Sequence, residues 1–340
     1  MKLNLNPGRI SGRNSVNEND SLILDVSVII CCYNSQKRIV ETLRHLAQQE
    51  SGGLDVEIIL VDNNCSDDTV SFAVDLWARL KPGFPLHVIR ENMPGLSNAR
   101  KAGIYQAKGE ILVFCDDDNW LAEDYINVAF KTMMEHTDVG ACCGQNFPFP
   151  ASGTPLPVWF SDFSELYACG RYLTHSGDVT TRKAIWGAGM VIRRTLIIGM
   201  YKNGMVHIMT DRKGSNLSSG GDTEICYWLT FLGWKLWFEE KLKLNHFIEF
   251  DRLTVAYRDS LKMALWSSTS ILNGFYDPIR KSLRPLRKMD FVNIFRIDEI
   301  GKTSRLKLGL GLFTDPSFRN SLVLRKMIRH GMFSSNGQVF

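Results

Sequence analysis

The sequence predicts an α/β fold in which a mostly parallel central sheet is flanked by helices. Short, continuous runs of apolar and β-branched residues recur in the first 120 residues, as is typical of strands buried on both faces. Segments with apolar residues at helical spacing lie between these runs, and such alternation indicates a parallel sheet. The chain has 340 residues, of which 44% are hydrophobic, enough for one large domain or for two.

The elements follow one another regularly up to residue 116. We expect strands at 26–33, 56–62, 85–90 and 110–116, and helices at 35–50, 66–80 and 95–108. Ser66 and Asp67 are suited to cap the second of these helices.

The regular alternation ends near residue 145. We expect a loop at 145–163, a strand or hairpin at 180–194, a glycine loop leading into a helix at 218–234, one or two strands at 235–248, and helices from 250 onward. We therefore divide the chain into a polar N-terminal segment (1–24), a main domain (25–250) with halves at 25–125 and 126–250, and a basic helical C-terminal region (251–340).

Charge is distributed unevenly along the chain. Residues 250–340 carry 16 Lys and Arg against 7 Asp and Glu, a net +9, whereas the whole chain carries only +4. A basic region of this kind can dock on an anionic membrane surface, or it can be the solvated face of a helical subdomain. Nucleic-acid binding is not expected, because no recognisable nucleic-acid module accompanies these residues.

Cysteine usage and the N-terminus bear on the compartment. The eight cysteines show no Cys-x-x-Cys spacing, which favours buried free thiols in a reducing cytosol over a zinc site. The N-terminus lacks the apolar core of a signal peptide, and no run of 18 apolar residues occurs. We expect a cytoplasmic protein that is not secreted and that can associate peripherally with the inner face of the membrane.

Polar residues follow all four predicted strands of the first half. Ligands of open α/β sheets bind outside the carboxyl ends of the strands, so these polar ends are expected to form one site. They are Tyr33 and Asn34, 62–64, 90–92, and 116–118. Neither G-x-G-x-x-G nor G-x-x-x-x-G-K-[ST] is present, which disfavours a dinucleotide dehydrogenase and a P-loop enzyme.

Three consecutive aspartates follow the last of these strands. Crowded carboxylates repel one another, so the triplet indicates either a solvated turn that caps the next helix or a site for a divalent cation. In extended geometry Asp116 and Asp118 would point the same way, and Asp117 would face elsewhere. This spacing makes Asp116 and Asp118 the pair expected at the site.

Together these motifs resemble the family-two glycosyltransferases of the GT-A fold. The matching stretches are VSVIICCYN, VEIILVDNNCSDDT and ENMPGLSNARKAGIYQAKGEILVFCDDDNWL, which cover residues 25–125 closely and reach loosely to about 250. The resemblance implies transfer of a sugar from a nucleotide-diphosphate sugar, commonly a UDP-sugar, to an acceptor hydroxyl with inversion. It further implies a divalent cation (Mn²⁺ or Mg²⁺), a nucleotide-sugar half (25–125) and an acceptor half (126–250).

The resemblance also implies site residues. It places Tyr33, Asn34, Asp62, Asn92, Arg100, Asp116 and Asp117 at the nucleotide-sugar, and Asp118, Asp116 and His246 at the metal. Asp62 matches the carboxylate that accepts a hydrogen bond from the base. Asn119 stands where many relatives carry a further acid. A lone histidine near an apolar strand is more often structural, so His246 has that alternative.

The catalytic base is expected from SSGGDTEICYW (218–228), which resembles the family's Glu-Asp motif at a helix start. Gly221 replaces the first acid, leaving Asp222 as the candidate base and Glu224 as the runner-up. The alternative is an ordinary helix N-cap.

The WGAGM segment resembles the loop that lets donor sugar and acceptor approach the backbone; a plain turn is its alternative. It comprises Trp186, Gly187, Ala188 and Gly189, followed by Met190. The expected partners are a nucleotide-sugar and a glycan or lipid-linked acceptor. Two other functions stay open, a sugar-nucleotidyltransferase and a non-catalytic nucleotide-sugar-binding protein. Q-x-x-R-W is absent, which favours single addition over processive synthesis.

Overall fold

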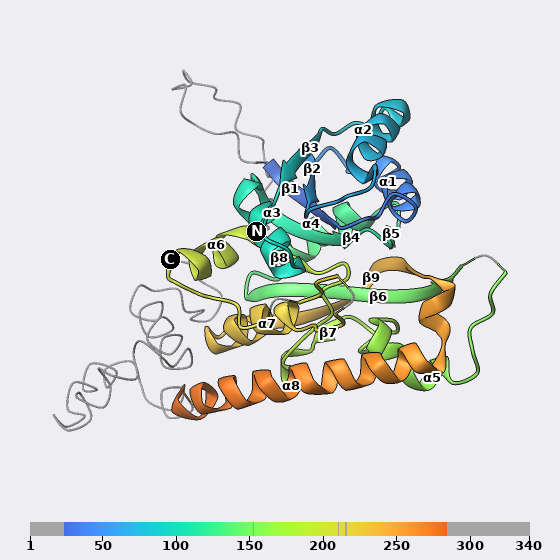
Figure 1. The fold of residues 1–340 in the computed structure, drawn as a ribbon. Coiled ribbons are helices and arrows are strands. Elements are labelled where there is room, and N and C mark those ends of the chain that lie inside the picture. The colour runs from blue at the N-terminus through green and yellow to red at the C-terminus, as the bar shows by residue number, and fades with distance from the viewer. Residues whose placement is uncertain (1–23, 152, 210, 215, 284–340) are drawn as a thin grey trace, which may run out of the picture.

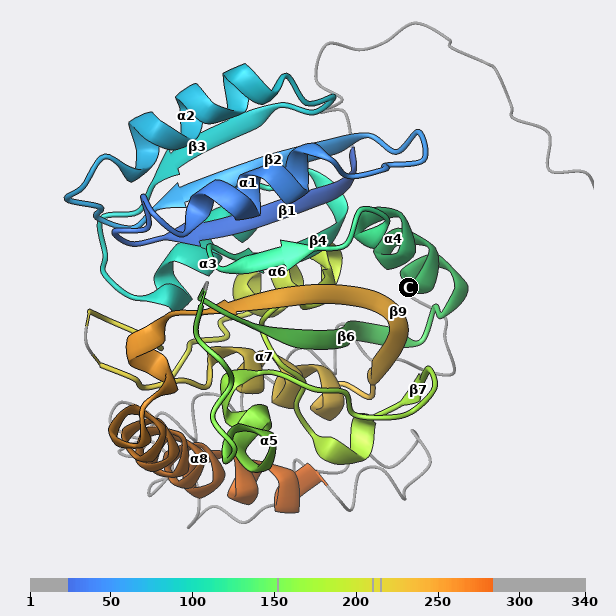
Figure 2. The same ribbon diagram turned by 90° about the vertical axis from the view of Figure 1, so that its right-hand side faces the viewer.

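The computed structural model describes residues 24–151, 153–209, 211–214 and 216–283 (Figure 1). They form one central sheet with helices on both faces, and a long helix lies outermost on one side (Figures 1 and 2). Residues 1–23 of the predicted polar N-terminal segment and residues 284–340 of the predicted basic region lie outside the described residues.

The sheet of the described chain is mixed. Its strands are β1 (Leu24–Cys32), β2 (Val56–Asp62), β3 (Leu86–Arg90), β4 (Gly109–Asp116), β5 (Asn119–Leu121), β6 (Val139–Pro150), β7 (Gly177–Asp178), β8 (Val191–Arg193) and β9 (Lys235–Ile248). Their order is β3-β2-β1-β4-β8-β6-β9-β5, with β7 also paired to β9. β1 to β4 are parallel as predicted, whereas β8, β5 and β7 run antiparallel to their neighbours. The α/β fold with a central sheet flanked by helices is therefore confirmed, with a parallel first half and a mixed second half.

Helices cover both faces of this sheet. The α-helices are α1 (Ile39–Ala47), α2 (Thr69–Leu80), α3 (Leu96–Gln106), α4 (Tyr125–Glu135), α5 (Phe160–Phe163), α6 (Arg194–Lys202), α7 (Gly221–Phe231) and α8 (Val255–Leu283). Short 3₁₀ segments are η1 (Ser164–Tyr167), η2 (Thr180–Arg182) and η3 (Phe250–Leu253). Val28 and Ile30 of β1 pack with α1, α2 and α4, while Ile29 packs with α3, α6 and α7 on the other face. Such alternation is what a strand buried on both faces requires.

The register of the parallel strands aligns their carboxyl ends. Cys32 of β1 lies opposite Asp62 of β2, and Cys31 lies opposite Asp116 of β4. The polar residues that end these strands consequently meet at one edge of the sheet, as the sequence predicted.

The predicted loop at 145–163 is wrong in its first part. Residues 145–150 continue β6, where Pro148 lies opposite His246 and Pro150 opposite Ile248 of β9. β6 pairs with β8 at Ala141 and Cys142. Residues 145–150 lie beyond that pairing, so their edge opposite β9 does not pair with β8. A strand side without ladder partners tolerates prolines, which lack the N–H. The predicted strand near 191, the helix after the glycine loop and the strand at 235–248 are present.

The long helix α8 begins the predicted C-terminal region. Its buried residues Leu272 and Tyr276 belong to the same apolar cluster as α7, and Met263 and Trp266 are exposed. Among the described residues, no helix combines the length and the apolar character needed to cross a bilayer.

Candidate active site

A cavity of about 1220 Å³ lies at the carboxyl edge of β1 and β4 and extends to α7 and α8. Most of the predicted site residues line it: Tyr33, Asn92, Arg100, Asp116, Asp117, Asp118, Trp186, Gly187, Ala188, Asp222 and His246. The structure thus brings together groups that are up to 213 positions apart in the sequence. Asn34, Asp62, Gly189 and Glu224 are not among the lining residues.

The aspartate triplet does not have the extended geometry that its spacing suggested. β4 ends at Asp116, and Asp117 and Asp118 form a turn that leads into β5. All three residues line the cavity, so the prediction that Asp117 faces elsewhere is wrong. The two-residue period fails because it holds only while the strand continues. The carboxylate of Asp116 lies 3.4 Å from the buried guanidinium of Arg100 on α3.

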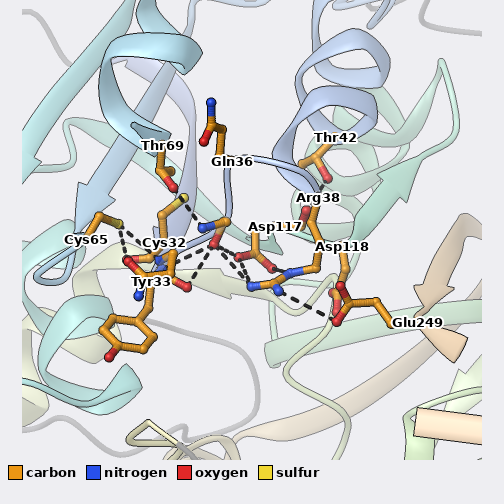
Figure 3. Close-up of polar contacts among 12 residues, drawn as sticks. Cys32, Tyr33, Gln36, Arg38, Thr42, Cys65, Thr69, Asp117, Asp118 and Glu249 are labelled. Atoms are coloured by element: carbon orange, nitrogen blue, oxygen red, sulfur yellow. Dashed lines mark hydrogen bonds and ion pairs between the residues drawn. The ribbon is translucent and has the colours of Figure 1, made fainter. Parts of the chain in front are cut away.

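The side chain of Asp117 is held by the loop that follows β1 (Figure 3). Arg38 donates to both of its oxygens, at 3.3 and 3.1 Å, and the hydroxyl of Ser35 donates to it as well. Arg38 also lies 3.7 Å from Glu249 at the end of β9. Burial raises the pKa of Asp117 to about 6, although Arg38 opposes this shift. Asp117 therefore ties the β1 loop to the carboxyl end of β4.

The side chain of Asp118 lies between two basic groups. Its Oδ2 accepts a hydrogen bond from Arg252 at 3.1 Å, and its Oδ1 lies 3.4 Å from Nε2 of His246. Burial favours the neutral acid, but His246 and Arg252 outweigh it and hold the pKa of Asp118 well below its usual range. Burial likewise opposes charge on His246, yet Asp118 raises the imidazole pKa to about 10. The Sγ of Cys169 lies 3.8 Å from Nδ1 of His246, which leaves Nε2 directed at Asp118.

The donor atoms of Asp118 and His246 are spaced nearly as two neighbouring ligands of one octahedral cation would be. Two ligands in adjacent octahedral positions at about 2.1 Å from a metal are about 3.0 Å apart, close to the 3.4 Å between these atoms. No cluster of three His, Cys, Asp or Glu side chains suited to a metal occurs in the described residues. A cation with one carboxylate and one imidazole from the protein keeps positions for waters and phosphate oxygens, as Mg²⁺ commonly does.

The carboxylate of Asp222 stands at the first turn of α7. Its Oδ2 accepts the backbone N–H of Gly187 at 2.8 Å, and its Oδ1 accepts that of Thr223 at 2.7 Å. Any side chain at position 187 would crowd both Asp222 and Arg100, because a Cβ there would lie about 3 Å from each. Burial raises the pKa of Asp222, Asp211 adds to the rise, and Arg100 opposes it. The predicted base and the WGAGM loop are thus linked directly.

Glu224, the alternative base, lies away from the cavity. It is fully buried and accepts hydrogen bonds from the backbone N–H groups of Ile208 and Met209 and from the hydroxyl of Tyr276. Its carboxylate also lies 3.2 Å from His207. These contacts tie the loop before α7 to α8.

Three other predicted residues support the cavity from outside its lining. The side-chain oxygen of Asn34 accepts the backbone N–H of Ser66, and the carboxylate of Asp62 accepts that of Cys65, each at 2.8 Å. The carbonyl of Gly189 accepts the hydroxyl of Tyr125 at 2.6 Å. Each contact fixes a turn next to the cavity.

Aromatic rings and a cation form the wall of the cavity around the WGAGM loop. The rings of Tyr172 and Trp186 lie 4.1 Å apart, and the guanidinium of Arg182 lies 4.2 Å from the centre of the Tyr172 ring. The Tyr172 hydroxyl accepts the backbone N–H of Trp186 at 3.1 Å. Such an aromatic wall can pack against a sugar ring.

The sequence did not single out Arg38, Asp211 or Arg252, which also line the cavity. Arg38 could have been suspected, because it lies in the segment that follows the first predicted strand. Asp211 stands in a loop and Arg252 in the short 3₁₀ segment η3, and neither has a periodic or motif signal in the sequence. Asp211 contacts Gly221, which belongs to α7, and Arg252 contacts Asp118, which is 134 positions away in the sequence.

Comparison with protein families gives one match. The model described as "Glycosyl transferase family 2" matches residues 27–197, half of the chain. The match covers β1 to β8, and so it includes the aspartate triplet and the WGAGM loop but not Asp222.

Individual relatives align over shorter stretches. Poly(ribitol-phosphate) beta-N-acetylglucosaminyltransferase TarS of Staphylococcus aureus (strain Mu50) is 31% identical over 114 residues, 34% of this chain and 20% of TarS. GalNAc(5)-diNAcBac-PP-undecaprenol beta-1,3-glucosyltransferase of Campylobacter jejuni subsp. jejuni serotype O:2 is 30% identical over 119 residues, 34% of this chain and 35% of that protein. The chain thus matches about a third or less of these relatives' lengths. The crystal structure of GalNAc-T7 with UDP, GalNAc and Mn²⁺ aligns with a TM-score of 0.49 and 18% identity, over 68% of this chain and 45% of that one.

Proposed function

The chain belongs to glycosyl transferase family 2, and on that basis we propose that it transfers a sugar from a nucleotide-diphosphate sugar, in the first instance a UDP-sugar, to an acceptor hydroxyl. One observation carries the proposal: the aspartate triplet, Arg100 and Asp222 line the same cavity. An inverting transfer needs a site for a charged leaving group and a carboxylate that takes a proton, and this cavity offers both.

The donor would bind along the carboxyl ends of β1, β2 and β4. Tyr33 and Asn92 line this side of the cavity and offer a ring and an amide group to a nucleoside. Arg100 lies behind them, where a buried guanidinium can attract phosphate oxygens. Recognition of the base by Asp62 stays a prediction, since Asp62 is not among the lining residues.

A divalent cation, Mn²⁺ or Mg²⁺, would be held by Asp118 and His246, with Asp116 close to its hydration shell. When bound, it would neutralise charge on the leaving diphosphate. The charges already present set a condition on this step. His246 must lose its proton before Nε2 can bind a metal, and Arg252 must share Asp118 with it.

Asp222 would act as the general base. As the acceptor oxygen forms its bond to the anomeric carbon, the bond from that carbon to the diphosphate oxygen breaks, and the acceptor proton passes to Asp222. Its oxygens accept backbone N–H groups of Thr223 and Gly187, which fix the carboxylate but leave lone pairs for the proton. Attack from the face opposite the leaving group inverts the anomeric carbon.

The acceptor would enter past Trp186 and Tyr172, and we propose a glycan or a lipid-linked glycan. The name of one relative supports a lipid-linked glycan, since it gives an undecaprenol-linked glycan as acceptor, while another relative's name gives the polymer poly(ribitol-phosphate). A lipid-linked acceptor would be reached at the inner face of a membrane, consistent with the basic composition of residues 250–340.

A donor screen tests this function. We expect the protein with Mn²⁺ to release UDP slowly from UDP-glucose or UDP-N-acetylglucosamine with water as acceptor, and not to do so with EDTA. The same screen includes a sugar 1-phosphate with a nucleoside triphosphate. Pyrophosphate release in that arm, with no nucleotide diphosphate released from any nucleotide-sugar, would instead indicate a sugar-nucleotidyltransferase. No turnover in either arm would contradict catalysis.

A further inference from the structure

Position 221 of α7 is a glycine because another carboxylate occupies the adjoining space. A Cβ on Gly221 would lie 2.2 Å from Oδ2 of Asp211 and 2.7 Å from Oγ of Ser97, so these side chains would have to move to make room for it. The backbone N–H of Gly221 donates to Oδ1 of Asp211 at 2.7 Å. Asp211, ten positions earlier in the chain, thus places its acid where a side chain at the start of α7 would otherwise stand.

Asp211 is held there firmly and at a conformational cost. Its φ is +57°, a left-handed conformation that L-residues with side chains adopt rarely. The hydroxyl of Ser97 donates to Oδ2 at 2.9 Å, and the backbone N–H of Leu96 donates to the carbonyl of Arg212 at 3.2 Å. These contacts dock the segment on the first turn of α3, the helix that also carries Arg100. The side chain is 2% exposed, yet the residue lines the cavity.

We propose that Asp211 is a second acid of the active centre, a positioning residue that fixes the start of α7 and shares Arg100 with Asp222. The inference rests on the proposed function, because it assigns Asp222 the proton of the acceptor. Arg100 interacts electrostatically with Asp116, Asp211 and Asp222, so one guanidinium serves three carboxylates. Because Arg100 also serves Asp211, Asp222 has no basic side chain to itself. Its carboxylate therefore keeps a high affinity for a proton.

The alternative is that Asp211 merely caps α7, as aspartates at helix starts often do. A cap needs an acceptor oxygen and no charge, so asparagine would serve as well. The two roles therefore differ in what Asp211→Asn does, because this change keeps the shape and the oxygen that accepts from Gly221 but removes the charge.

The charge is tested with D211N, using UDP release from a UDP-sugar with Mn²⁺ as the readout. We expect the rate to fall about tenfold and its acid limb to move to lower pH, because a neighbouring charge shifts a partly buried carboxyl by about one pH unit. The groups that face Asp222 are Arg100 from α3, Asp211, Tyr172 and Cys226 of α7. An unchanged rate and pH profile would overturn the proposal in favour of a cap.

The position of the acid is tested by moving it. D211G removes the acid and the nearest contact at position 221, leaving Oγ of Ser97 at 2.7 Å from the Cβ position, so D211G/G221D and D211G/G221E return a carboxylate to the same space from α7. We expect D211G to lose about tenfold or more in rate, and at least one double variant to recover most of it. If neither recovers any activity while both fold as D211G does, the proposal is overturned.

Two further measurements separate the inference from the proposed function. Adding G221A should lower the melting temperature of the wild-type protein more than that of D211G, a geometric result that needs no activity. Asp75→Asn, at an exposed site on α2, is the matched charge control and should leave the rate unchanged. If the wild-type protein turns over no nucleotide-sugar, both ideas fail; if it is active and D211N equals it, the inference alone fails.

Discussion

Two carboxylates of the cavity have opposite electrostatic surroundings. Asp118 lies between His246 and Arg252, two basic groups for one acid, and its pKa is held low. Asp222 shares Arg100 with other acids, one of them Asp211, and its pKa is raised. Burial raises both pKa values, so the signs of the neighbouring charges decide the difference between them.

The difference separates two chemical tasks. A carboxylate that stays ionised at every working pH suits a metal ion or a charged leaving group, whereas one with a raised pKa can take up a proton. Asp118 comes from the turn after a parallel strand and Asp222 from a helix start, so the fold brings the two kinds of acid to one cavity from different elements. The following predictions test this division.

The largest effect is expected at the proton acceptor. Asp222→Asn keeps the size of the side chain and removes the acceptor for the proton, so the turnover rate should fall by about 10²- to 10⁴-fold. Binding of UDP with Mn²⁺ should change by less than about threefold, as measured by calorimetry. A variant that loses nucleotide binding while its circular dichroism is unchanged would argue against a base role.

The next largest effect is expected at Asp118, the aspartate whose pKa is lowered. Asp118→Asn removes the charge that would hold the cation, so the Mn²⁺ concentration for half-maximal turnover should rise by about 10- to 100-fold. The control is Asp75→Asn on the exposed side of α2, for which no change is expected. Equal Mn²⁺ dependence in D118N and wild type would remove Asp118 from the metal site.

The pH profile sharpens the contrast. Asp222 accepts a proton only when it is ionised, so turnover should fall tenfold for each pH unit below its pKa. Because that pKa is raised, the fall should begin above pH 4, the region where an ordinary aspartate titrates. The rate is measured from pH 4 to 8 while circular dichroism follows the fold. A flat profile down to pH 4 would contradict the assignment.

The smallest effect on activity is expected at Glu224, two residues after Asp222 on α7. Glu224 accepts N–H groups of Ile208 and Met209, and Glu224→Gln replaces one acceptor oxygen with an amide that cannot accept them. We expect a loss of about 2 kcal/mol in the free energy of unfolding, measured by denaturant titration, with turnover changed less than about threefold. A catalytic loss as large as that of D222N, with unchanged stability, would make Glu224 a second candidate base.

The first half of the fold was predictable because its signals are local. Runs such as 58–61 are apolar throughout, and Asp116 directly follows another apolar run, 111–115, so strand, strand end and polar site can be read from neighbouring residues. The register of parallel strands then brings Cys31 opposite Asp116 without further information.

The second half was less predictable because its decisive contacts are distant in the sequence. Arg252 pairs with Asp118 across 134 positions, and Asp211 meets Ser97 across 114. A single charged residue in a loop or in a one-turn 3₁₀ segment carries no periodicity that would indicate such a partner. The prolines and aromatic residues of 145–163 predict a loop, whereas Pro148 and Pro150 lie in β6 because that strand pairs with β9.

The central claim is that this cavity binds a nucleotide diphosphate with a divalent cation at the aspartate triplet. The most direct measurement is a calorimetric titration of UDP into the wild-type protein, with Mn²⁺ and with EDTA. The account predicts saturable binding with Mn²⁺ that weakens by about tenfold or more with EDTA, and the same weakening in D118N even when Mn²⁺ is present. Absence of binding for UDP, GDP and dTDP in the presence of Mn²⁺, by a protein that is folded, would contradict it.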